Sequence, residues 1–413
     1  MTRQQPTCRS CGAPLSTVFA DLGLSPISNA FPRADTIATG EHVWPLKAMA
    51  CDRCLLVQIE DIVGRDTHFN DDYAYFSSVS SSWLDHAKRY VDMAVDRFSL
   101  TAASHVVEVA SNDGYLLRHF VARGIPSLGV DPAGNCAVAA KAWGVKTEVG
   151  FFGADMARHL AATYGKADLM VANNVLAHVP DLDDFVAGFA ALLKTEGTIT
   201  FEFPHLMQLV NGAQFDTIYH EHYSYLTEIA LAPLFDRHGL VAYDVERIQT
   251  HGGSLRLFVG HKATGQRETP ALRQLIDEER RAGLDDIATY WAFMASVQAT
   301  KRAILSCLIP LKNAGATICG YGAPAKATTL LNYCGIGADF LDFTVDRSPE
   351  KQGRRIPGTG IEILPPEAIS KYRPDYILIL PWNLKDEIIS QLAYVREWGC
   401  RFIVPIPEPT ILD

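Results

Sequence analysis

Short apolar runs alternate with longer amphipathic segments between residues 104 and 205. Buried strands are apolar runs of about four to eight residues and helices need about ten or more, so this alternation predicts βαβ units in a parallel sheet. The predicted strands are Val106–Val109, Ser127–Val130, Leu169–Ala172 and Thr198–Phe203. Two later runs, Val241–Ile248 and Ser254–Gly260, flank the turn 250–253 and predict an antiparallel pair that completes the sheet.

A second α/β unit follows a long helical segment. Residues 270–312 contain few helix breakers, and we expect a helical linker there. Beyond it, the turn from Tyr321 to Lys326 connects a strand to a helix. The strands predicted in this unit are Ala316–Gly320, Phe340–Val345 ending at Asp346, Tyr376–Leu380 and Arg401–Pro405.

Composition narrows the class of protein. The chain has 413 residues, which predicts two or three domains. Its net charge is −10 and its Lys and Arg residues form no cluster, so nucleic acid is not an expected partner. The apolar runs are too short to cross a bilayer and the N-terminus lacks a signal-peptide core, so no membrane association is expected. The sequence leaves the oligomeric state open and is compatible with a monomer.

Four of the nine cysteines form two pairs, Cys8/Cys11 and Cys51/Cys54, separated by 39 residues. Each pair has the C-x-x-C spacing, and four thiolates at this spacing make a closed tetrahedral site for structural Zn²⁺. A redox pair or an iron–sulfur cluster is the alternative, but neither pair lies at the strand–helix junction of a thioredoxin-like motif. The remaining five cysteines are scattered in apolar context, which favours a reducing cytoplasm over a disulfide framework.

The run from Val107 to Gly114 predicts a strand, a tight turn and a helix start, and Asp131 ends the next strand. Open α/β sheets hold adenosine cofactors in this way, with the strand-end carboxylate on the ribose hydroxyls. The glycine pattern of dinucleotide-binding turns is absent, and Glu108 with Ser111-Asn112-Asp113 stands in its place. Acceptors at this turn suit a cofactor with a positive centre and no pyrophosphate, which indicates S-adenosylmethionine. A purely structural βαβ turn is the alternative.

Ionisable and phenolic residues are dense between Tyr219 and Tyr225, soon after a predicted strand. Burying such groups without a function is costly. The H-E-x-x-H spacing of helical zinc sites is missing, and His220 and His222 would diverge in a strand or turn. A histidine beside a carboxylate and a tyrosine is better suited to general-base chemistry, because the carboxylate orients the ring. A solvated loop is the alternative.

With these motifs the chain resembles the sugar C-methyltransferases that act on nucleotide-linked 4-keto-6-deoxy sugars. The resemblance covers the whole chain. It depends on the two cysteine pairs together with six further motifs: residues 73–78, 108–114, 173–180, 219–222, 250–254 and 320–323. It implies an α/β fold with an N-terminal zinc-binding module (1–70), a central class I methyltransferase sheet of Rossmann type with a helical lead-in (71–265), and a helical linker with a C-terminal Rossmann-like domain (266–413).

The resemblance also implies a mechanism. The C-3' hydrogen of the sugar lies next to the C-4' ketone, so its removal by a base gives an enolate that attacks the methyl group of S-adenosylmethionine. His222 would be the base, supported by Glu221 and Tyr219, and His178 would polarise the ketone or stabilise the enolate. The product would enter deoxysugar, natural-product or surface-glycan biosynthesis.

Binding residues follow from the same resemblance. The cofactor is expected on Tyr73, Ser77, Glu108, Asn112, Gly114, Asp131, Phe151, Asn173 and Asn174. The nucleotide-linked sugar is expected on Tyr75, Phe76, His251, Tyr321, Lys326 and Arg355. Structural Zn²⁺ is expected on Cys8, Cys11, Cys51 and Cys54.

Other functions stay open on the sequence alone. C-5' methylation of a related sugar or O-methylation would use the same scaffold, although O-methylation needs less help from a base. A non-enzymatic zinc-binding scaffold would not need the ionisable cluster at 219–225. The sequence does not identify the nucleobase or the group at the methylated carbon.

Overall fold

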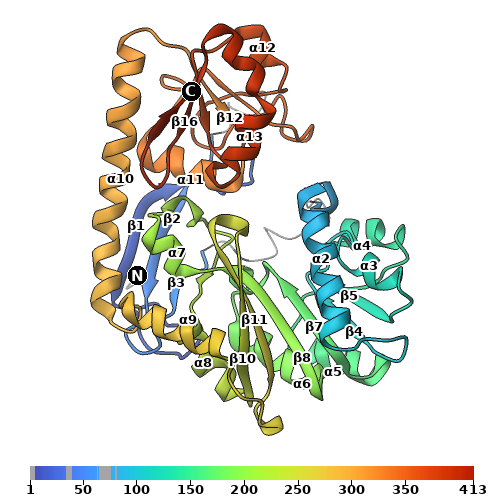
Figure 1. Ribbon diagram of the computed structural model, residues 1–413. Coiled ribbons are helices and arrows are strands. Elements are labelled where there is room, and N and C mark those ends of the chain that lie inside the picture. Colours follow the sequence, from blue (N-terminus) through green and yellow to red (C-terminus); the bar gives the residue numbers. More distant parts are fainter. Residues whose placement is uncertain (1–4, 34–39, 63, 65–75, 80) are drawn as a thin grey trace.

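The computed structural model describes residues 5–33, 40–62, 64, 76–79 and 81–413. Within these residues the strands form three sheets, of four, seven and six strands. The long helix α10 (Ile287–Asn313) runs along one side of the molecule, past the N-terminal strands and up to the C-terminal domain (Figure 1). Tyr73 and Tyr75 lie outside the described residues.

The seven-stranded central sheet has the order β10-β11-β8-β7-β4-β5-β6. Five strands are parallel, and β11 is antiparallel to both of its neighbours. The predicted parallel sheet with an antiparallel pair is therefore confirmed. Its strands are β4 (Val106–Val109), β5 (Ser127–Asp131), β6 (Lys146–Val149), β7 (Ala167–Asn173), β8 (Leu193–Pro204), β10 (Leu240–Ile248) and β11 (Ser254–His261).

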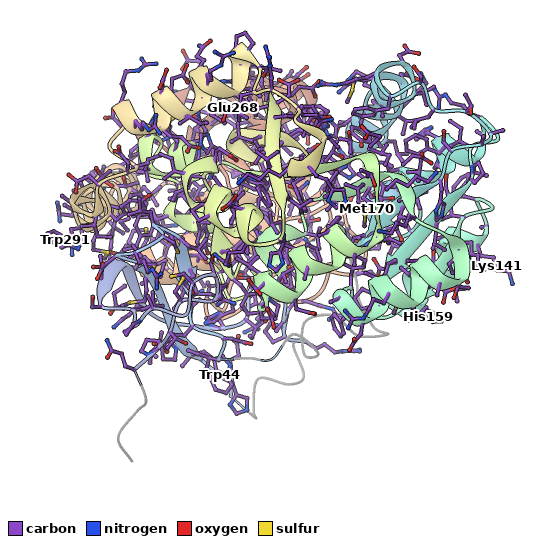
Figure 2. All side chains as sticks on the ribbon, turned by 90° about the horizontal axis from the view of Figure 1, so that it is seen from below. Trp44, Lys141, His159, Met170, Glu268 and Trp291 are labelled. Atoms are coloured by element: carbon purple, nitrogen blue, oxygen red, sulfur yellow. The ribbon has the colours of Figure 1, made fainter. Side chains whose placement is uncertain are left out.

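Helices cover this sheet and bury its apolar strands. Met170 of β7 lies in the interior, whereas Lys141 and His159 lie on outer helices (Figure 2). Side-chain caps define two helix starts, since Asp181 accepts from the Asp184 N–H and Thr227 from the Ala230 N–H. The helices are α2 (Ser81–Arg97), α3 (Leu117–Val121), α4 (Gly134–Lys141), α5 (Ala154–Tyr164), α6 (Leu182–Leu192), α7 (Leu206–Asn211) and α8 (Glu228–Arg237), with short 3-10 turns η2 (Ser77–Val79), η3 (Leu176–His178), η4 (Phe215–Thr217) and η5 (Thr250–Gly252).

The N-terminal sheet is antiparallel, with the order β1-β2-β3-β9. Its first three strands are β1 (Thr17–Ser25), β2 (Trp44–Ala50) and β3 (Val57–Ile59), all from the cysteine-containing segment. The fourth, β9 (Ser224–Tyr225), comes from the loop that carries the ionisable cluster. This loop is therefore part of the N-terminal sheet.

The helical segment after the central sheet consists of two helices, α9 (Pro270–Arg281) and α10, rather than one continuous stretch. Gly283 has a left-handed φ of 73°, which ends the first helix, and the Asp286 side chain accepts from the Ala288 N–H to start the second.

The C-terminal sheet has the order β14-β13-β12-β15-β16-β17, in which only β17 is antiparallel to its neighbour. This confirms a second Rossmann-like unit. Its strands are β12 (Ile318–Tyr321), β13 (Phe343–Val345), β14 (Ile363–Leu364), β15 (Tyr376–Ile379), β16 (Arg401–Val404) and β17 (Thr410–Leu412), and its helices are α11 (Ala325–Cys334), α12 (Ala368–Tyr372) and α13 (Lys385–Gln391), with the 3-10 turn η7 (Trp382–Leu384). Among the described residues, every helix is too short or too polar to span a bilayer.

Candidate functional site

The turn after β4 lies at the point where the strand order of the central sheet reverses, between β4 and β7. Ligands of open α/β sheets bind at this point, outside the carboxyl ends of the strands. Ala110, Asn112 and Gly114 all have positive φ, of 58°, 48° and 79°. Such backbone is costly for alanine and is found mostly where a function requires it. A Cβ on Gly114 would lie 3.1 to 3.3 Å from Val145 and Ala140, so the turn is also tightly packed.

Asp131, at the end of β5, holds this turn in place. Its carboxylate accepts from the Asn112 N–H at 2.8 Å and from the Ala133 N–H at 2.9 Å. Each carboxylate oxygen can accept a second hydrogen bond, so a ribose hydroxyl can still bind. Asp131 therefore shapes the cofactor turn as well as presenting a carboxylate to it.

Several polar side chains around this edge are buried without a hydrogen-bond partner within the part of the chain that the structure describes. They are both amide atoms of Asn173 and both amide atoms of Asn174. Burial and the nearby Asp131 and Asp113 raise the pKa of Glu108 well above its ordinary value, and Tyr115 opposes that rise. Unpartnered buried polar groups are costly, so a polar ligand fits here. The amino group and hydroxyls of S-adenosylmethionine would supply donors for the amide oxygens.

The 3-10 turn η2 lies against the cofactor turn. The Ser77 N–H donates to Asn112 Oδ1 at 2.9 Å, and the Ser78 N–H donates to Asp113 Oδ2 at 3.2 Å. Ser77 is thereby placed beside the turn, and the half-buried Phe76 directly precedes it. Phe151 follows β6 and is half-buried.

A second cluster brings Tyr219, His222 and His178 together. The rings of His178 and His222 lie 4.6 Å apart between centroids. His222 Nδ1 lies 3.1 Å from the Thr217 carbonyl oxygen, and its Nε2 lies 2.6 Å from the Tyr219 hydroxyl. A carbonyl can only accept, so Nδ1 carries the proton, and the lone pair of Nε2 accepts from the Tyr219 hydroxyl. Burial and the neighbouring His178 lower the pKa of His222 well below its ordinary value, which keeps the ring neutral.

Glu221 does not orient the His222 ring, contrary to the expectation from the sequence. Its carboxylate accepts from the Asn29 side-chain amide at 2.8 and 3.0 Å, so it faces the N-terminal sheet. The ring is oriented by Thr217 and Tyr219 instead. His220 also faces away, with Nε2 3.3 Å from the Pro45 carbonyl oxygen.

The C-terminal domain contacts the start of the loop that carries Tyr219 and His222. Trp382 Nε1 donates to Asp216 Oδ2 at 2.7 Å, and Thr329 Oγ1 donates to the Ile218 carbonyl at 2.8 Å. Asp216 is fully buried, and burial raises its pKa to about 6. These residues were not predicted, although Asp216 lies three residues before the ionisable run Tyr219–Tyr225 and Trp382 lies two residues after the predicted strand Tyr376–Leu380.

The residues expected to bind the substrate lie in several places. His251, with a positive φ of 54°, packs edge-on against Trp83, and Lys326 Nζ lies 4.0 Å from the centre of the Trp382 ring and donates to Asn383. Burial lowers the pKa of Lys326 to about 8. Tyr321 ends β12, with its hydroxyl 3.4 Å from Gln391. The Arg355 N–H donates to the Pro32 carbonyl, which places this residue toward the N-terminal segment.

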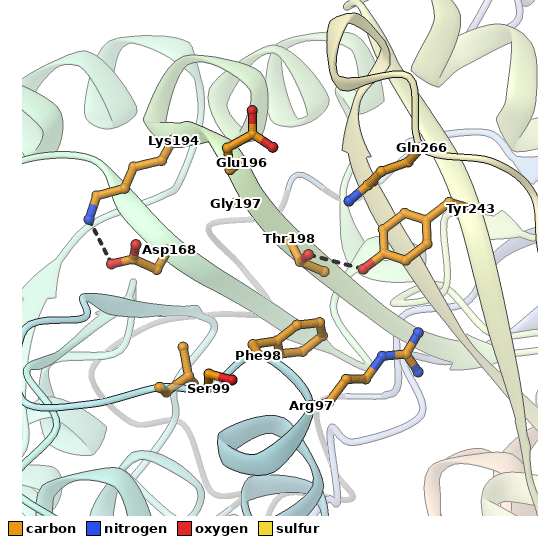
Figure 3. Close-up of a pocket in the computed structure, with 11 residues that line it drawn as sticks. Arg97, Phe98, Ser99, Asp168, Lys194, Glu196, Gly197, Thr198, Tyr243 and Gln266 are labelled. Atoms are coloured by element: carbon orange, nitrogen blue, oxygen red, sulfur yellow. Dashed lines mark hydrogen bonds and ion pairs between the residues drawn. The ribbon is translucent and has the colours of Figure 1, made fainter.

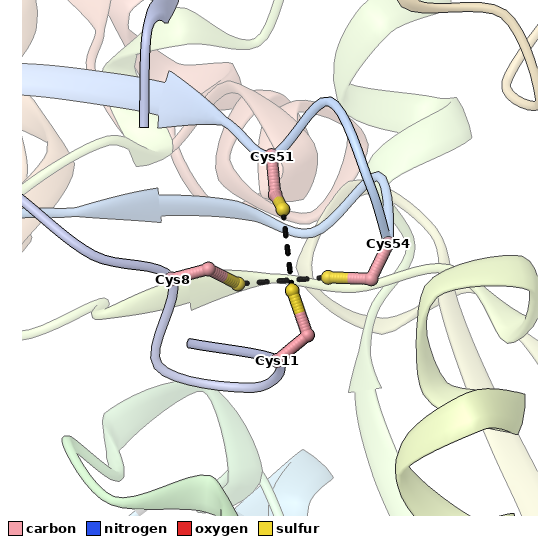
Figure 4. A group of neighbouring side chains, drawn as sticks. All are labelled: Cys8, Cys11, Cys51 and Cys54. Carbon is pink, nitrogen blue, oxygen red and sulfur yellow. Dashed lines mark hydrogen bonds between the residues drawn. The ribbon is translucent and has the colours of Figure 1, made fainter. Parts of the chain in front are cut away.

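The four predicted cysteine ligands converge. Their sulfur atoms all lie within 4.8 Å of one another, and they point toward a common centre (Figure 4). The Cys8–Cys54 and Cys11–Cys51 sulfur pairs are each 3.5 Å apart. A tetrahedral site with Zn–S bonds of about 2.3 Å requires similar separations between sulfurs. The residues therefore fit a closed zinc site.

A hollow of about 440 Å³ lies at the opposite edge of the central sheet, near the amino ends of β7 and β8 (Figure 3). Two of its charged side chains are paired, Lys194 with Asp168 at 2.7 Å and Arg97 with Asp244 at 2.5 Å. Its position at the amino ends of the strands separates it from the cofactor turn and the histidine cluster.

Comparison with known proteins identifies the family. Three family profiles match the chain: "Putative zinc binding domain" over residues 8–69, "Methyltransferase domain" over residues 83–245 and "C-methyltransferase C-terminal domain" over residues 249–407. C-methyltransferase NovU of Streptomyces niveus is 36% identical over 406 residues, which cover 98% of this chain and 96% of that protein. The chain belongs to the C-methyltransferase family.

Two solved structures are similar to part of the chain at low sequence identity. Magnesium protoporphyrin IX methyltransferase from Synechocystis, with bound S-adenosylmethionine, is 14% identical, covers 44% of this chain and 81% of its own, and has a TM-score of 0.34. The PH0226 protein from Pyrococcus horikoshii is 14% identical, covers 46% of this chain and 95% of its own, and has a TM-score of 0.37.

The expected enzyme class and cofactors are confirmed. The C-methyltransferase is an S-adenosylmethionine-dependent enzyme with an N-terminal zinc-binding domain. Glu108, Asn112, Asp131, Asn173 and Asn174 would hold the cofactor at the carboxyl edge of the central sheet.

Replacing Asp131 by alanine should raise the dissociation constant for S-adenosylmethionine by roughly 10- to 100-fold. A charge-assisted hydrogen bond to ribose contributes about 1.5–3 kcal/mol, and the turn also loses the acceptor for the Asn112 N–H. Titration calorimetry measures this dissociation constant. Asp131→Asn is the control: it keeps one acceptor oxygen, so its dissociation constant should lie between those of the wild type and Asp131→Ala. Unchanged affinity in folded Asp131→Ala would remove this residue from the cofactor site.

Replacing Glu221 by glutamine should flatten the pH dependence of stability. Burial raises the pKa of Glu221 to about 7, from 4.5 in the unfolded chain. Between these two pH values the Glu221 carboxyl is protonated in the folded protein but ionised in the unfolded chain. The stability that Glu221 contributes in this way is complete below pH 4.5 and is lost as the pH rises through about 7.

Between acidic and neutral pH, the free energy of unfolding of the wild type should fall by roughly 3 kcal/mol more than that of Glu221→Gln. Urea unfolding at a series of pH values measures this difference, and the exposed Glu350→Gln serves as the control. Parallel curves for Glu221→Gln and the wild type would contradict it.

Proposed function

We propose that the enzyme methylates a carbon next to the ketone of a nucleotide-linked 4-keto-6-deoxy sugar, at C-3', through an enolate. The observation that supports this proposal is the fixed tautomer of His222. Its Nδ1–H donates to the Thr217 carbonyl, so the basic Nε2 points toward the Tyr219 hydroxyl, and we place the substrate on that side of the ring. A neutral histidine with a directed lone pair is suited to removing a proton from carbon.

The roles of the other residues follow from their positions. His222 Nε2 takes the C-3' proton, and the electrons of the C–H bond move into the enolate. His178, 4.6 Å from His222 between ring centroids, donates to the ketone oxygen as negative charge develops there. The Tyr219 hydroxyl holds Nε2 in place until the substrate arrives. Bound S-adenosylmethionine supplies the methyl group as an electrophile.

The substrate would lie between the central sheet and the C-terminal domain. His251 lies in the β10–β11 connection and Lys326 on α11, and these two regions meet, because a Cβ on Gly252 would lie 2.9 Å from the Trp382 ring. Lys326 carries the positive charge expected to meet the phosphates of the nucleotide.

A substrate panel tests this proposal. The enzyme is incubated with methyl-labelled S-adenosylmethionine and 4-keto-6-deoxy sugars on dTDP and on GDP, and the product is analysed by NMR. A new C–CH₃ group at C-3' is the expected result. Label at C-5' or on oxygen would replace the proposed position or reaction, and a total lack of transfer across the panel would contradict the substrate class.

A further inference from the structure

Arg9 lies between the two expected zinc ligands Cys8 and Cys11 in the sequence, and its side chain reaches the Pro180 and Ile59 carbonyls. Its backbone is tied to that site, because the Arg9 N–H donates to Gln58 Oε1 at 2.9 Å and Gln58 Nε2 donates to Cys8 Sγ at 3.2 Å. The start of the Arg9 side chain is therefore fixed by the zinc-binding loop.

The guanidinium of Arg9 contacts both segments that carry the active-site histidines. One nitrogen donates to the Pro180 carbonyl at 2.8 Å, two residues after His178. The guanidinium carbon also lies 5.2 Å from the centre of the Tyr223 ring, directly after His222. A second nitrogen donates to the Ile59 carbonyl at 2.5 Å, and the Ile59 N–H donates to the Tyr223 carbonyl at 3.1 Å.

We propose that Arg9 is a positioning residue that holds the His178 and His222 segments in register with the zinc-binding loop. A planar guanidinium can donate in two directions while its face packs on an aromatic ring, and this is the combination of contacts seen here. The proposal rests on the proposed function of the two histidines. In this proposal the zinc-binding domain keeps His178 and His222 in their catalytic positions, while the metal itself takes no part in the reaction.

Arg9→Met tests the proposal, with Arg53→Met as the control. Arg53 is the exposed arginine of the second cysteine pair. Arg9→Met should keep about one zinc per chain and bind S-adenosylmethionine with an affinity within about twofold of the wild type, because the cofactor turn does not contact Arg9. Its kcat should fall by about 10- to 30-fold with little change in KM. Arg53→Met should match the wild type in all four measurements.

The pH profile separates positioning from simple loss of folded protein. His222 faces His178, Tyr219, Tyr225 and His251, and its burial keeps it neutral. Release of the Tyr223 segment would expose His222 to water, so the acid limb of kcat should move to higher pH in Arg9→Met. A fall in the amount of folded enzyme would lower kcat without moving this limb.

Arg9→Lys provides a second variant if Arg9→Met does not fold. Lysine keeps the charge but cannot bridge both segments, so kcat should fall by about three- to tenfold with zinc retained. Wild-type kcat and pH profile in Arg9→Lys would overturn the proposal. Loss of zinc in both variants would also overturn it, because Arg9 would then serve the metal site alone. His222→Ala, measured in parallel, shows separately whether the proposed base is correct.

Discussion

His222→Ala is expected to lose about 10²- to 10⁴-fold in kcat for methyl transfer while both ligands still bind, because a positioned base contributes about that much. Nε2 is the basic atom, since Nδ1 donates to the Thr217 carbonyl. Tyr219→Phe should lose less, because it removes the hydroxyl held at 2.6 Å from Nε2 but leaves the base. Steady-state kinetics of the two variants, with titration of each ligand, measures these effects.

Isotope exchange isolates the proton-transfer step. In deuterated solvent the wild type should exchange the C-3' hydrogen of the substrate when S-adenosylhomocysteine fills the cofactor site, and His222→Ala should not. Glu221→Gln is the matched control, because its side chain faces Asn29 and should leave exchange nearly intact. Near-wild-type methylation by His222→Ala would place the base elsewhere, and His178 would be tested next.

The central sheet and the cofactor turn could be predicted because their signals are local. Apolar runs at strand length, separated by helices, define a parallel sheet, and the carboxyl ends of such strands meet at one edge. Glu108 lies one residue before the end of its predicted strand, and Asp131 and Asn173 directly follow theirs, so their position at one edge followed from the fold. The four cysteines were predictable for a similar reason, because C-x-x-C spacing carries its own geometry.

The surroundings of the ionisable loop could not be predicted, because its partners are distant in the sequence. Asn29 is 192 residues from Glu221, and Arg9 is 171 residues from Pro180. The two-residue strand β9 is too short to show a pattern, yet it pairs with β3 of the N-terminal sheet. A histidine next to a glutamate suggested that the two side chains interact. In the turn closed by the His222 N–H to the Tyr219 carbonyl, however, the Glu221 carboxylate binds Asn29 and the His222 ring binds Tyr219.

Cys51→Ser is expected to weaken zinc binding by about 100-fold or more. Structural zinc sites contribute roughly 10–16 kcal/mol, so the loss of one thiolate from four costs roughly 3 kcal/mol. The site joins the loop before β1, which carries Cys8 and Cys11, to the β2–β3 connection, which carries Cys51 and Cys54. Without the metal these strands lose a shared anchor, and the N-terminal sheet should unfold at a lower temperature than in the wild type.

The same substitution should also slow methyl transfer without weakening the binding of S-adenosylmethionine. Strand β3 pairs with β9, which begins two residues after His222, so a loosened sheet releases the active-site loop. The cofactor turn between Glu108 and Gly114 is built on the central sheet instead. Metal analysis, thermal unfolding, cofactor titration and kcat together measure this separation. Cys307→Ser, a half-buried cysteine on α10 outside the cluster, is the control and should match the wild type. A Cys51→Ser protein with full zinc content and full activity would show that these four sulfurs are not the metal site.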